Sequence, residues 1–250
     1  MKHIYSRKRL GQLALMAFLS TGCQKIHDYV GEHPGAEIRT CTIRQFIYHP
    51  LHSGDPDTLT FTYNATGDPV KVTRREPRTG APNFQFKYKN GKLAEFIGVY
   101  KDGQSTESWH RYSYSPNGLV SVDSVYNFAK IVGGLPEDPI DSYAITFQYD
   151  NKGRIIHEKR TYPDGSFFGE SFQYNSDGNR VGAQYGQNVS IRRTNKIWMF
   201  LDRNYSINDR LGSSNHNASY MPTSITLGSE DFDIFLQCYF GKATIDYLCK

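Results

Sequence analysis

The sequence lacks the short motifs that identify common enzyme classes. It contains no GxGxxG or GxxxxGK[ST] loop for a nucleotide phosphate, and no GxSxG turn for a serine nucleophile. His157 and Glu158 begin like the zinc motif HExxH, but Thr161 occupies the position of the second histidine. We therefore expect no catalytic residue, no cofactor and no metal ion, and we predict that the protein is not an enzyme.

Long apolar runs are also missing, since none approaches the roughly 20 residues that cross a bilayer. One ten-residue apolar stretch, LGQLALMAFL, does occur at 10–19. It follows the basic segment MKHIYSRKR and precedes the small residues of STGC. This order is typical of an export signal, so we predict that residues 1–22 are a signal peptide.

Acidic residues are absent from this predicted signal, and their absence accounts for the net charge of the whole chain. Residues 1–22 hold four Lys and Arg; 29 basic residues less these four leaves 25, which equals the 25 acidic residues. Binding to the phosphates of nucleic acid needs a basic face. A mature chain with no net charge therefore predicts no nucleic-acid partner.

The stretch LSTGC at 19–23 resembles the lipobox of bacterial lipoproteins. The resemblance implies that Cys23 becomes the new N-terminus and carries acyl chains, so that the membrane is a partner through a lipid anchor. Residues 23–38 would then be a tether, and we expect the protein in the cell envelope, at the outer membrane. The alternative is an ordinary secretory signal that is cut nearby.

Three further cysteines, Cys41, Cys238 and Cys249, are few enough to be considered one by one. An exported chain permits disulfides. If a hairpin turns at Gly241 and Lys242, Cys238 and Cys249 do not lie opposite each other. A bridge from Cys41 to either of them would join the first strand to the last, and buried free thiols are the alternative.

One short sequence motif occurs five times in the chain. In each copy a tyrosine is followed three or four residues later by glycine, with turn-forming residues between them; the tyrosines are Tyr63, Tyr88, Tyr114, Tyr149 and Tyr174. Apolar and polar residues alternate on both sides of the turns, which predicts β-hairpins. Because a lone hairpin is marginally stable, we expect a mainly β fold, an antiparallel meander of stacked hairpins.

The clearest copies, YDNKGRI at 149–155 and YNSDGNRV at 174–181, resemble the YD repeat of bacterial RHS-type proteins. Together with LSTGC, they make the chain similar to YD-repeat-like lipoproteins of Bacteroidota over roughly residues 40–230. The resemblance implies β architecture and no catalytic residue. Five copies are too few for the closed shell that long RHS chains form.

The chain departs from the repeat at about residue 190. Apolar residues at helical spacing within 194–204 predict one short helix, which Thr194 or Asn195 would cap. We interpret 208–222 as a loop and the segments after it as closing strands. This end of the chain would cap the last edge of the sheet.

Four rings near an inserted loop at 127–141 are candidates for stacking on a ligand. They are Trp109, Tyr100, Tyr112 and Tyr126. The alternative is core packing, because these rings follow the strand alternation.

We predict a single β domain over 39–250 that acts as a non-catalytic binding or scaffold module, with a glycan or an envelope protein as its partner. One alternative is a carbohydrate-binding accessory protein. Another is an envelope hydrolase that uses two of the carboxylates at solvent-facing strand positions, although nothing in the sequence singles out one pair. These carboxylates are Glu95, Glu107, Glu158 and Glu170.

Overall fold

The structure is a computed structural model, and it describes residues 37–38, 41–50, 55–228 and 231–249. The predicted signal peptide, the predicted acylation site Cys23 and most of the predicted tether lie outside the described residues. Among the described helices, none is long and apolar enough to cross a membrane.

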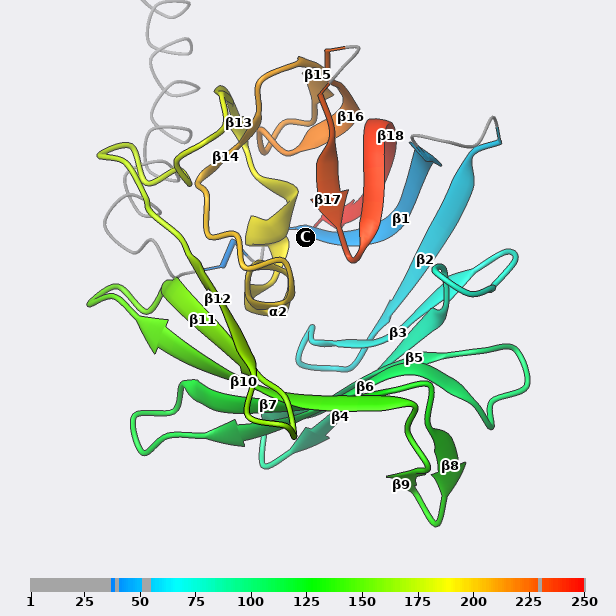
Figure 1. The fold of residues 1–250 in the computed structure, drawn as a ribbon. Helices are drawn as coiled ribbons and strands as arrows, with labels where there is room; N and C mark the ends of the chain where they lie inside the picture. Colours follow the sequence, from blue (N-terminus) through cyan, green and yellow to red (C-terminus); the bar gives the residue numbers. More distant parts are fainter. Residues whose placement is uncertain (1–36, 39–40, 51–54, 229–230, 250) are drawn as a thin grey trace, which may run out of the picture.

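One large antiparallel sheet of 14 strands forms most of the protein, which confirms the predicted mainly β meander (Figure 1). Its spatial order is β12-β11-β10-β7-β6-β5-β4-β3-β2-β1-β18-β16-β15, and β17 also pairs with β18. The repeats supply β2 (Asp57–Tyr63), β3 (Pro69–Arg74), β4 (Asn83–Lys89), β5 (Lys92–Val99), β6 (Thr106–Tyr114), β7 (Val120–Asn127), β10 (Asp141–Tyr149), β11 (Ile155–Thr161) and β12 (Phe167–Ser171). The chain ends supply β1 (Cys41–Pro50), β15 (Ser213–His216), β16 (Pro222–Thr226), β17 (Asp233–Phe235) and β18 (Cys238–Cys249).

The remaining elements are short. Two small antiparallel pairs are β8 (Lys130–Val132) with β9 (Leu135–Glu137), and β13 (Tyr185–Val189) with β14 (Asn208–Arg210). The 3-10 turn η1 (Ile191–Thr194) leads into the helix α2 (Lys196–Leu201). The Asn195 side chain accepts a hydrogen bond from the backbone N–H of Ile197 at 2.9 Å, so the predicted helix and one of its two proposed caps are confirmed.

The sheet curves around α2, which lies on its concave side (Figure 1). Trp198 of the helix is fully buried, and its ring meets those of Phe61, Phe86 and Phe235 edge-on, with centroids 5.6, 5.6 and 5.9 Å apart. Edge-to-face contacts at such distances stabilise an aromatic cluster beyond the burial of its area. The main core is therefore the space between the curved sheet and this short helix.

The repeat tyrosines connect each hairpin to the strand before it. The phenol of Tyr88 donates to the carbonyl of Pro69 (2.6 Å), that of Tyr114 to Leu93 (2.7 Å) and that of Tyr149 to Val120 (2.9 Å); Tyr63 donates to Ile43 in the same way (2.9 Å). Pro69 and Val120 each open the strand that follows the preceding turn. Burial raises the pKa of Tyr114 to about 12, and that of Tyr149 further, so these phenols stay protonated and can donate.

The fourth copy shows the structural roles of the other residues of the repeat. Oδ1 of Asp150 accepts the backbone N–H groups of Lys152 and Arg154, both at 2.9 Å, and Gly153 takes a positive φ of 73°. The Arg154 guanidinium donates a hydrogen bond to the Asp150 carboxylate (Nε–Oδ2, 2.7 Å). It also lies 4.2 Å from the ring centroid of Tyr174 in the next copy. This copy thus forms both a turn and a contact with the next copy.

The fifth copy does not form the expected hairpin. Tyr174 makes only an isolated bridge with Arg180, and the main sheet ends at β12. The turn itself is kept, because Oδ1 of Asn175 accepts the N–H of Asn179 at 2.9 Å. This copy therefore retains the turn chemistry without adding a strand pair.

Two expectations for the C-terminal end were wrong. The strand β18 runs unbroken through Gly241 and Lys242, and the chain turns earlier, at Leu236 and Gln237, which have positive φ angles of 49° and 64°. The stretch 208–222, expected to be a loop, contains β14 and β15. The strand β18 pairs with β1 on one side and with β16 on the other, and this pairing overrides the turn preference of Gly241.

The C-terminal segment lies at the opposite edge of the sheet from the one expected. It adds β18, β16 and β15 beside β1, while β12 remains exposed along its whole length.

A disulfide joins Cys41 of β1 to Cys249 of β18, and Cys238 is a buried free thiol. Of the two bridges considered for Cys41, the structure has the one that joins residues directly opposite in the β1–β18 register.

We predict that Tyr149→Phe destabilises the protein by about 1–2 kcal/mol, because the carbonyl of Val120 loses its phenol donor while the ring remains. Urea denaturation followed by circular dichroism measures this change. Tyr239→Phe is the matched control, since this ring is half exposed and lies outside the repeat. Equal unfolding midpoints for the two variants would show that the phenol bonds contribute nothing.

Candidate functional site

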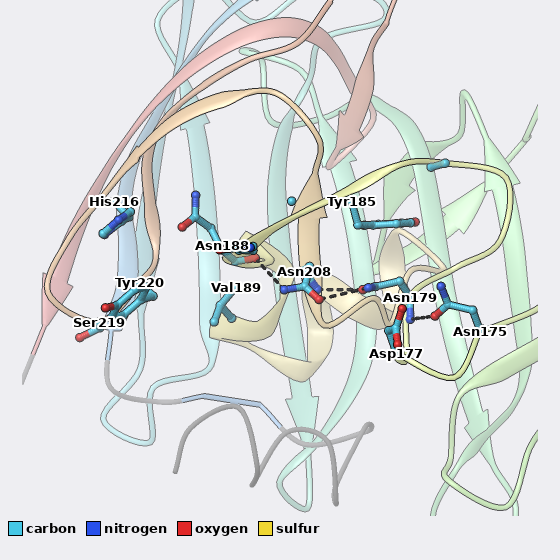
Figure 2. A pocket seen from close by; sticks show the side chains of 13 residues that line it. Asn175, Asp177, Asn179, Tyr185, Asn188, Val189, Asn208, His216, Ser219 and Tyr220 are labelled. Atoms are coloured by element: carbon cyan, nitrogen blue, oxygen red, sulfur yellow. Dashed lines mark hydrogen bonds between the residues drawn. The ribbon is translucent and has the colours of Figure 1, made fainter. Parts of the chain in front are cut away.

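A pocket of about 740 Å³ lies beside the main sheet (Figure 2). Three parts of the chain meet there: the turn of the fifth repeat, the strand β13 with the start of β14, and the turn between β15 and β16. We call it the amide pocket, because five of its lining residues carry a side-chain amide. These are Asn175, Asn179, Gln187, Asn188 and Asn208.

Two of these amides are buried and hold each other in place. Asn179 is 4% exposed and Asn208 is 8% exposed. The backbone N–H of Asn208 donates to Oδ1 of Asn179 at 2.9 Å, and Nδ2 of Asn179 donates to Oδ1 of Asn208 at 3.1 Å. We call these two residues the asparagine wall. Their mutual hydrogen bonds fix one side of the pocket before any ligand binds.

The turn of the fifth repeat packs tightly behind this wall. A Cβ on Gly178 would lie 2.6 Å from Cδ1 of Ile207, and Gly178 also has a positive φ of 77°. Only glycine fits here, so the turn sits close against the residue that precedes Asn208.

Two aromatic side chains form the opposite side of the pocket. The rings of His216 and Tyr220 stack with centroids 4.8 Å apart and planes 13° apart, and both residues are exposed. Figure 2 shows them, with Ser219, across the pocket from Tyr185 and Asn175. Tyr220 has a positive φ of 57°, an unusual backbone conformation for an aromatic residue.

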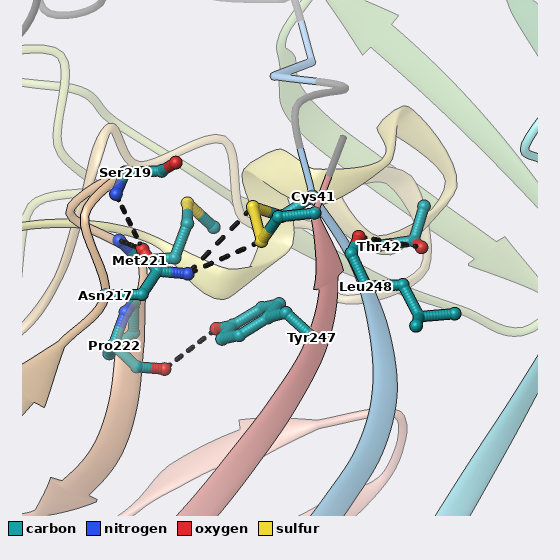
Figure 3. The surroundings of a disulfide bond; sticks show 9 residues. Cys41, Thr42, Asn217, Ser219, Met221, Pro222, Tyr247 and Leu248 are labelled. Atoms are coloured by element: carbon teal, nitrogen blue, oxygen red, sulfur yellow. Dashed lines mark hydrogen bonds between the residues drawn. A yellow bond between two sulfur atoms is a disulfide. The ribbon is translucent and has the colours of Figure 1, made fainter.

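The disulfide supports the turn that carries these rings (Figure 3). Oδ1 of Asn217 accepts the backbone N–H groups of Ser219 (2.9 Å) and Met221 (3.1 Å). Its Nδ2 lies 3.9 and 3.7 Å from the sulfurs of Cys41 and Cys249. The link between the first and last strands therefore also positions one side of the amide pocket.

A buried carboxyl group, Asp209, follows Asn208 directly. Burial raises its pKa to about 7, although the side chains of Asn188 and Ser214 oppose that shift. Neither carboxyl oxygen has a hydrogen-bond partner of good geometry within the described part of the chain. A Cβ on Gly186 would come within 3.1 Å of Oδ1, which places this carboxyl against β13, the strand that lines the pocket.

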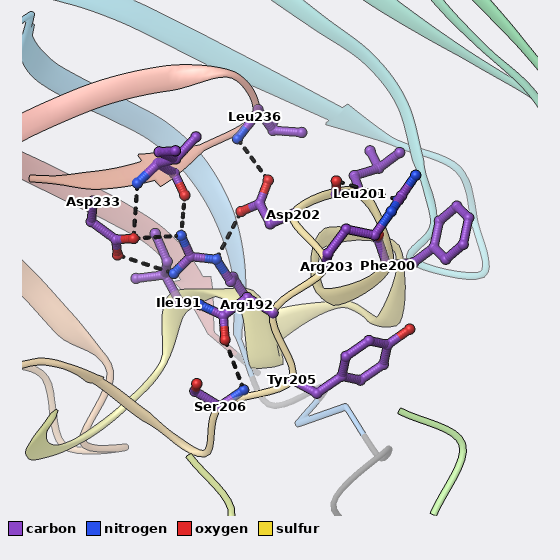
Figure 4. A network of polar contacts seen from close by, with 12 residues as sticks. Ile191, Arg192, Phe200, Leu201, Asp202, Arg203, Tyr205, Ser206, Asp233 and Leu236 are labelled. Atoms are coloured by element: carbon purple, nitrogen blue, oxygen red, sulfur yellow. Dashed lines mark hydrogen bonds and ion pairs between the residues drawn. The ribbon is translucent and has the colours of Figure 1, made fainter. Parts of the chain in front are cut away.

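A second polar cluster lies around Arg192 and has a structural role (Figure 4). Its guanidinium makes two bonds to Asp233 (3.1 and 2.9 Å) and one to Asp202 (2.8 Å). Burial alone would lower the pKa of Arg192, but these carboxylates raise it, so the group stays charged. Oδ1 of Asp202 also accepts the N–H of Leu236 at 3.1 Å, which joins the end of α2 to the β17–β18 turn.

Another hollow, of about 420 Å³, lies between the sheet and the end of α2. His110 and Asp123 meet there at 2.9 Å (Nδ1–Oδ2), and Arg203 pairs with Glu158 at 2.8 Å (Nε–Oε2). Asp123 and Glu158 thus each have a partner. Among the described residues, no group of three or more His, Cys, Asp or Glu could hold a metal ion.

The carboxylates considered for a hydrolase all have partners, as Glu158 does. Glu95 pairs with Lys87 at 2.8 Å and Glu170 with Arg180 at 2.9 Å, while Glu107 accepts the backbone N–H of Gly80 at 2.7 Å. They are held by different neighbours, and the structure does not gather them around the amide pocket.

The four rings suggested for ligand stacking do not share one surface. Trp109 is fully buried against Ile97 and Val99, and Tyr126 packs partly buried on the same cluster. Tyr112 packs instead against Phe200 of α2, with ring centroids 5.3 Å apart. Tyr100 is partly buried and donates to Glu107 at 3.1 Å.

Sequence reasoning missed the residues of the amide pocket. Asn175, Asn208 and Tyr220 all lie in segments that read as turns or loop, because Asn is common in turns. The clustering of Asn between 175 and 217 was a usable signal, but it could not show that the segments meet.

No family model matches the chain, and no curated protein matches it either. Among solved structures, a porin-like protein from Bacteroides uniformis has 12% identity over 83% of this chain and 98% of its own, with a TM-score of 0.42. A porin-like protein from Bacteroides vulgatus has 11% identity over 82% and 98%, with a TM-score of 0.39. TcdB2-TccC3-TEV has 11% identity over 71% of this chain and 10% of its own, with a TM-score of 0.23. Similarity of this degree transfers no function.

We predict that Asp209→Asn stabilises the protein at pH 8 more than at pH 4. The folded pKa of about 7 lies above the ordinary 3.8, so ionisation costs stability progressively as the pH rises from about 4 to 7. A pKa unit corresponds to about 1.4 kcal/mol, so the gain at pH 8 is up to about 4 kcal/mol. Urea denaturation at both pH values measures it.

Asp177→Asn is the control for this experiment, because Asp177 is an exposed carboxyl at the same pocket. A gain of equal size at both pH values would contradict an ionisation cost at Asp209.

Proposed function

We propose that this protein is a non-catalytic binding module of the cell envelope, held by a lipid anchor at Cys23, and that the amide pocket is its ligand site. One observation carries the binding role: a wide pocket is lined by five side-chain amides, and two of them are buried and bonded to each other. Asparagine and glutamine side chains are neither nucleophiles nor effective acids or bases at neutral pH, so the amide part of the lining favours recognition over catalysis.

The repeats support a scaffold role beneath this site. Their tyrosines, turn carboxylates and glycines have the structural roles that a YD-repeat-like lipoprotein would need. The lipobox-like LSTGC supports an envelope location, with the outer membrane as the proposed site. Of the alternatives, a carbohydrate-binding accessory role has specific support in the exposed rings of His216 and Tyr220.

We predict that Cys23 carries acyl chains in a lipoprotein-processing bacterium. Mass spectrometry of the mature N-terminal peptide should show the acylated cysteine, and Cys23→Ser should move the protein from the membrane to the soluble fraction. Ser20→Leu is the control, since it brings the sequence nearer to the usual lipobox and should keep the protein on the membrane. Release of both variants, or of neither, would contradict anchoring at this residue.

We predict that Ser219→Trp, which fills the amide pocket, abolishes ligand binding. Thermal shifts of the wild type in defined libraries of oligosaccharides, peptides and lipids identify a ligand, and the variant should lose the shift. Ser176→Trp is the matched control, because Ser176 is exposed and is not among the residues that line the pocket. If no compound shifts the wild type, or if the two variants respond alike, the amide pocket is not a binding site.

A further inference from the structure

We propose that the amide pocket binds a neutral carbohydrate, stacked on the Tyr220 ring and hydrogen-bonded by the asparagine wall. This inference rests on the proposed binding function and specifies its ligand class. Three independent features of the pocket lead to it: its charge, its hydrogen-bonding groups and its exposed rings.

The charge of the lining excludes an anionic ligand. None of the described residues that line the pocket is Lys or Arg, and the one carboxylate among them, Asp177, is exposed. Phosphate, sulfate and uronate groups are usually held by Arg or Lys through charge-assisted bonds. Acidic polysaccharides and nucleic acid would therefore lose their hydration here without gaining a counter-charge.

The hydrogen-bonding groups match hydroxyls. Each side-chain amide offers donors and an acceptor in one plane, and a sugar hydroxyl both donates and accepts. Asn179 and Asn208 hold each other through two hydrogen bonds, and Nδ2 of Asn208 also reaches the backbone carbonyl of Asn188 at 3.4 Å. The amides on this wall thus keep fixed orientations, so binding orders few side chains.

The rings supply the apolar contact. The C–H face of a pyranose is apolar, and an exposed tyrosine offers a flat, rigid surface with a polar tip. Tyr220 is 41% exposed, and His216 backs its ring at 4.8 Å, so Tyr220 cannot swing freely. The volume of about 740 Å³ lies in the range of small-molecule sites, and it has room for a ligand reaching from Tyr220 toward Tyr185.

The test is isothermal titration of the full chain, in detergent, with neutral oligosaccharides: cellohexaose, maltoheptaose, mannohexaose and xylohexaose. Oligogalacturonate and heparin fragments are the acidic comparison. We expect saturable binding of at least one neutral oligosaccharide and of neither acidic one. Tyr220→Asn removes the ring but suits the positive φ, and it should weaken binding about tenfold or more.

A further variant controls for folding. Tyr239→Ala removes a half-exposed tyrosine that does not line the pocket, and it should bind like the wild type. Binding of acidic oligosaccharides alone, or unchanged affinity of Tyr220→Asn, would overturn the neutral-carbohydrate proposal. If a peptide or lipid bound and Ser219→Trp blocked it, the carbohydrate class would be wrong while the binding function stood.

Discussion

The hydrogen bond from a repeat tyrosine to a backbone carbonyl of the preceding strand is the contact on which the sheet depends. It crosses from one hairpin to the hairpin before it, so a copy that lacks its neighbour also lacks a partner for its phenol. Tyr88, Tyr114 and Tyr149 make this bond at successive turns along one end of the sheet. A buried phenol without a partner costs free energy, and this cost penalises any slip in register between hairpins. The meander therefore gains both its order and its stability from the same side chain.

A curved sheet of this kind leaves a concave side that must be filled, and the segment after the repeats fills it. Trp198 packs into the aromatic core, and Arg192 joins Asp202 at the end of the helix to Asp233 on β17. Both ends of the domain meet at the β1–β18 pair, which the disulfide closes across 208 residues of sequence. Closing so long a loop removes many conformations from the unfolded chain. The C-terminal segment is therefore part of the fold of the repeats and not an independent cap.

The sequence predicted those features that local chemistry determines. Period-two alternation and turn residues located the hairpins, and the spacing in 194–204 located α2. The wrong expectations concern pairing between distant segments. Gly241 and Lys242 resemble a turn, but β1 and β16 pair on both sides of β18 and keep it extended. The polar stretch after 208 resembles a loop because β14 and β15 are only three and four residues long and carry few apolar side chains.

The candidate site arises at the fifth copy of the repeat, which keeps its turn but adds no strand pair to the main sheet. In the fourth copy, the residue five places after the tyrosine is Arg154, which returns to Asp150 and covers Tyr174 of the next copy. The corresponding residue of the fifth copy is Asn179, which is too short to make this contact and bonds instead to Asn208 on β14. The turn is preserved, and one side of the pocket takes the place of the contact that Arg154 makes with the next copy. The last copy of a structural repeat thus ends in a polar surface, and the mutual hydrogen bonds of Asn179 and Asn208 keep its two buried amides ordered.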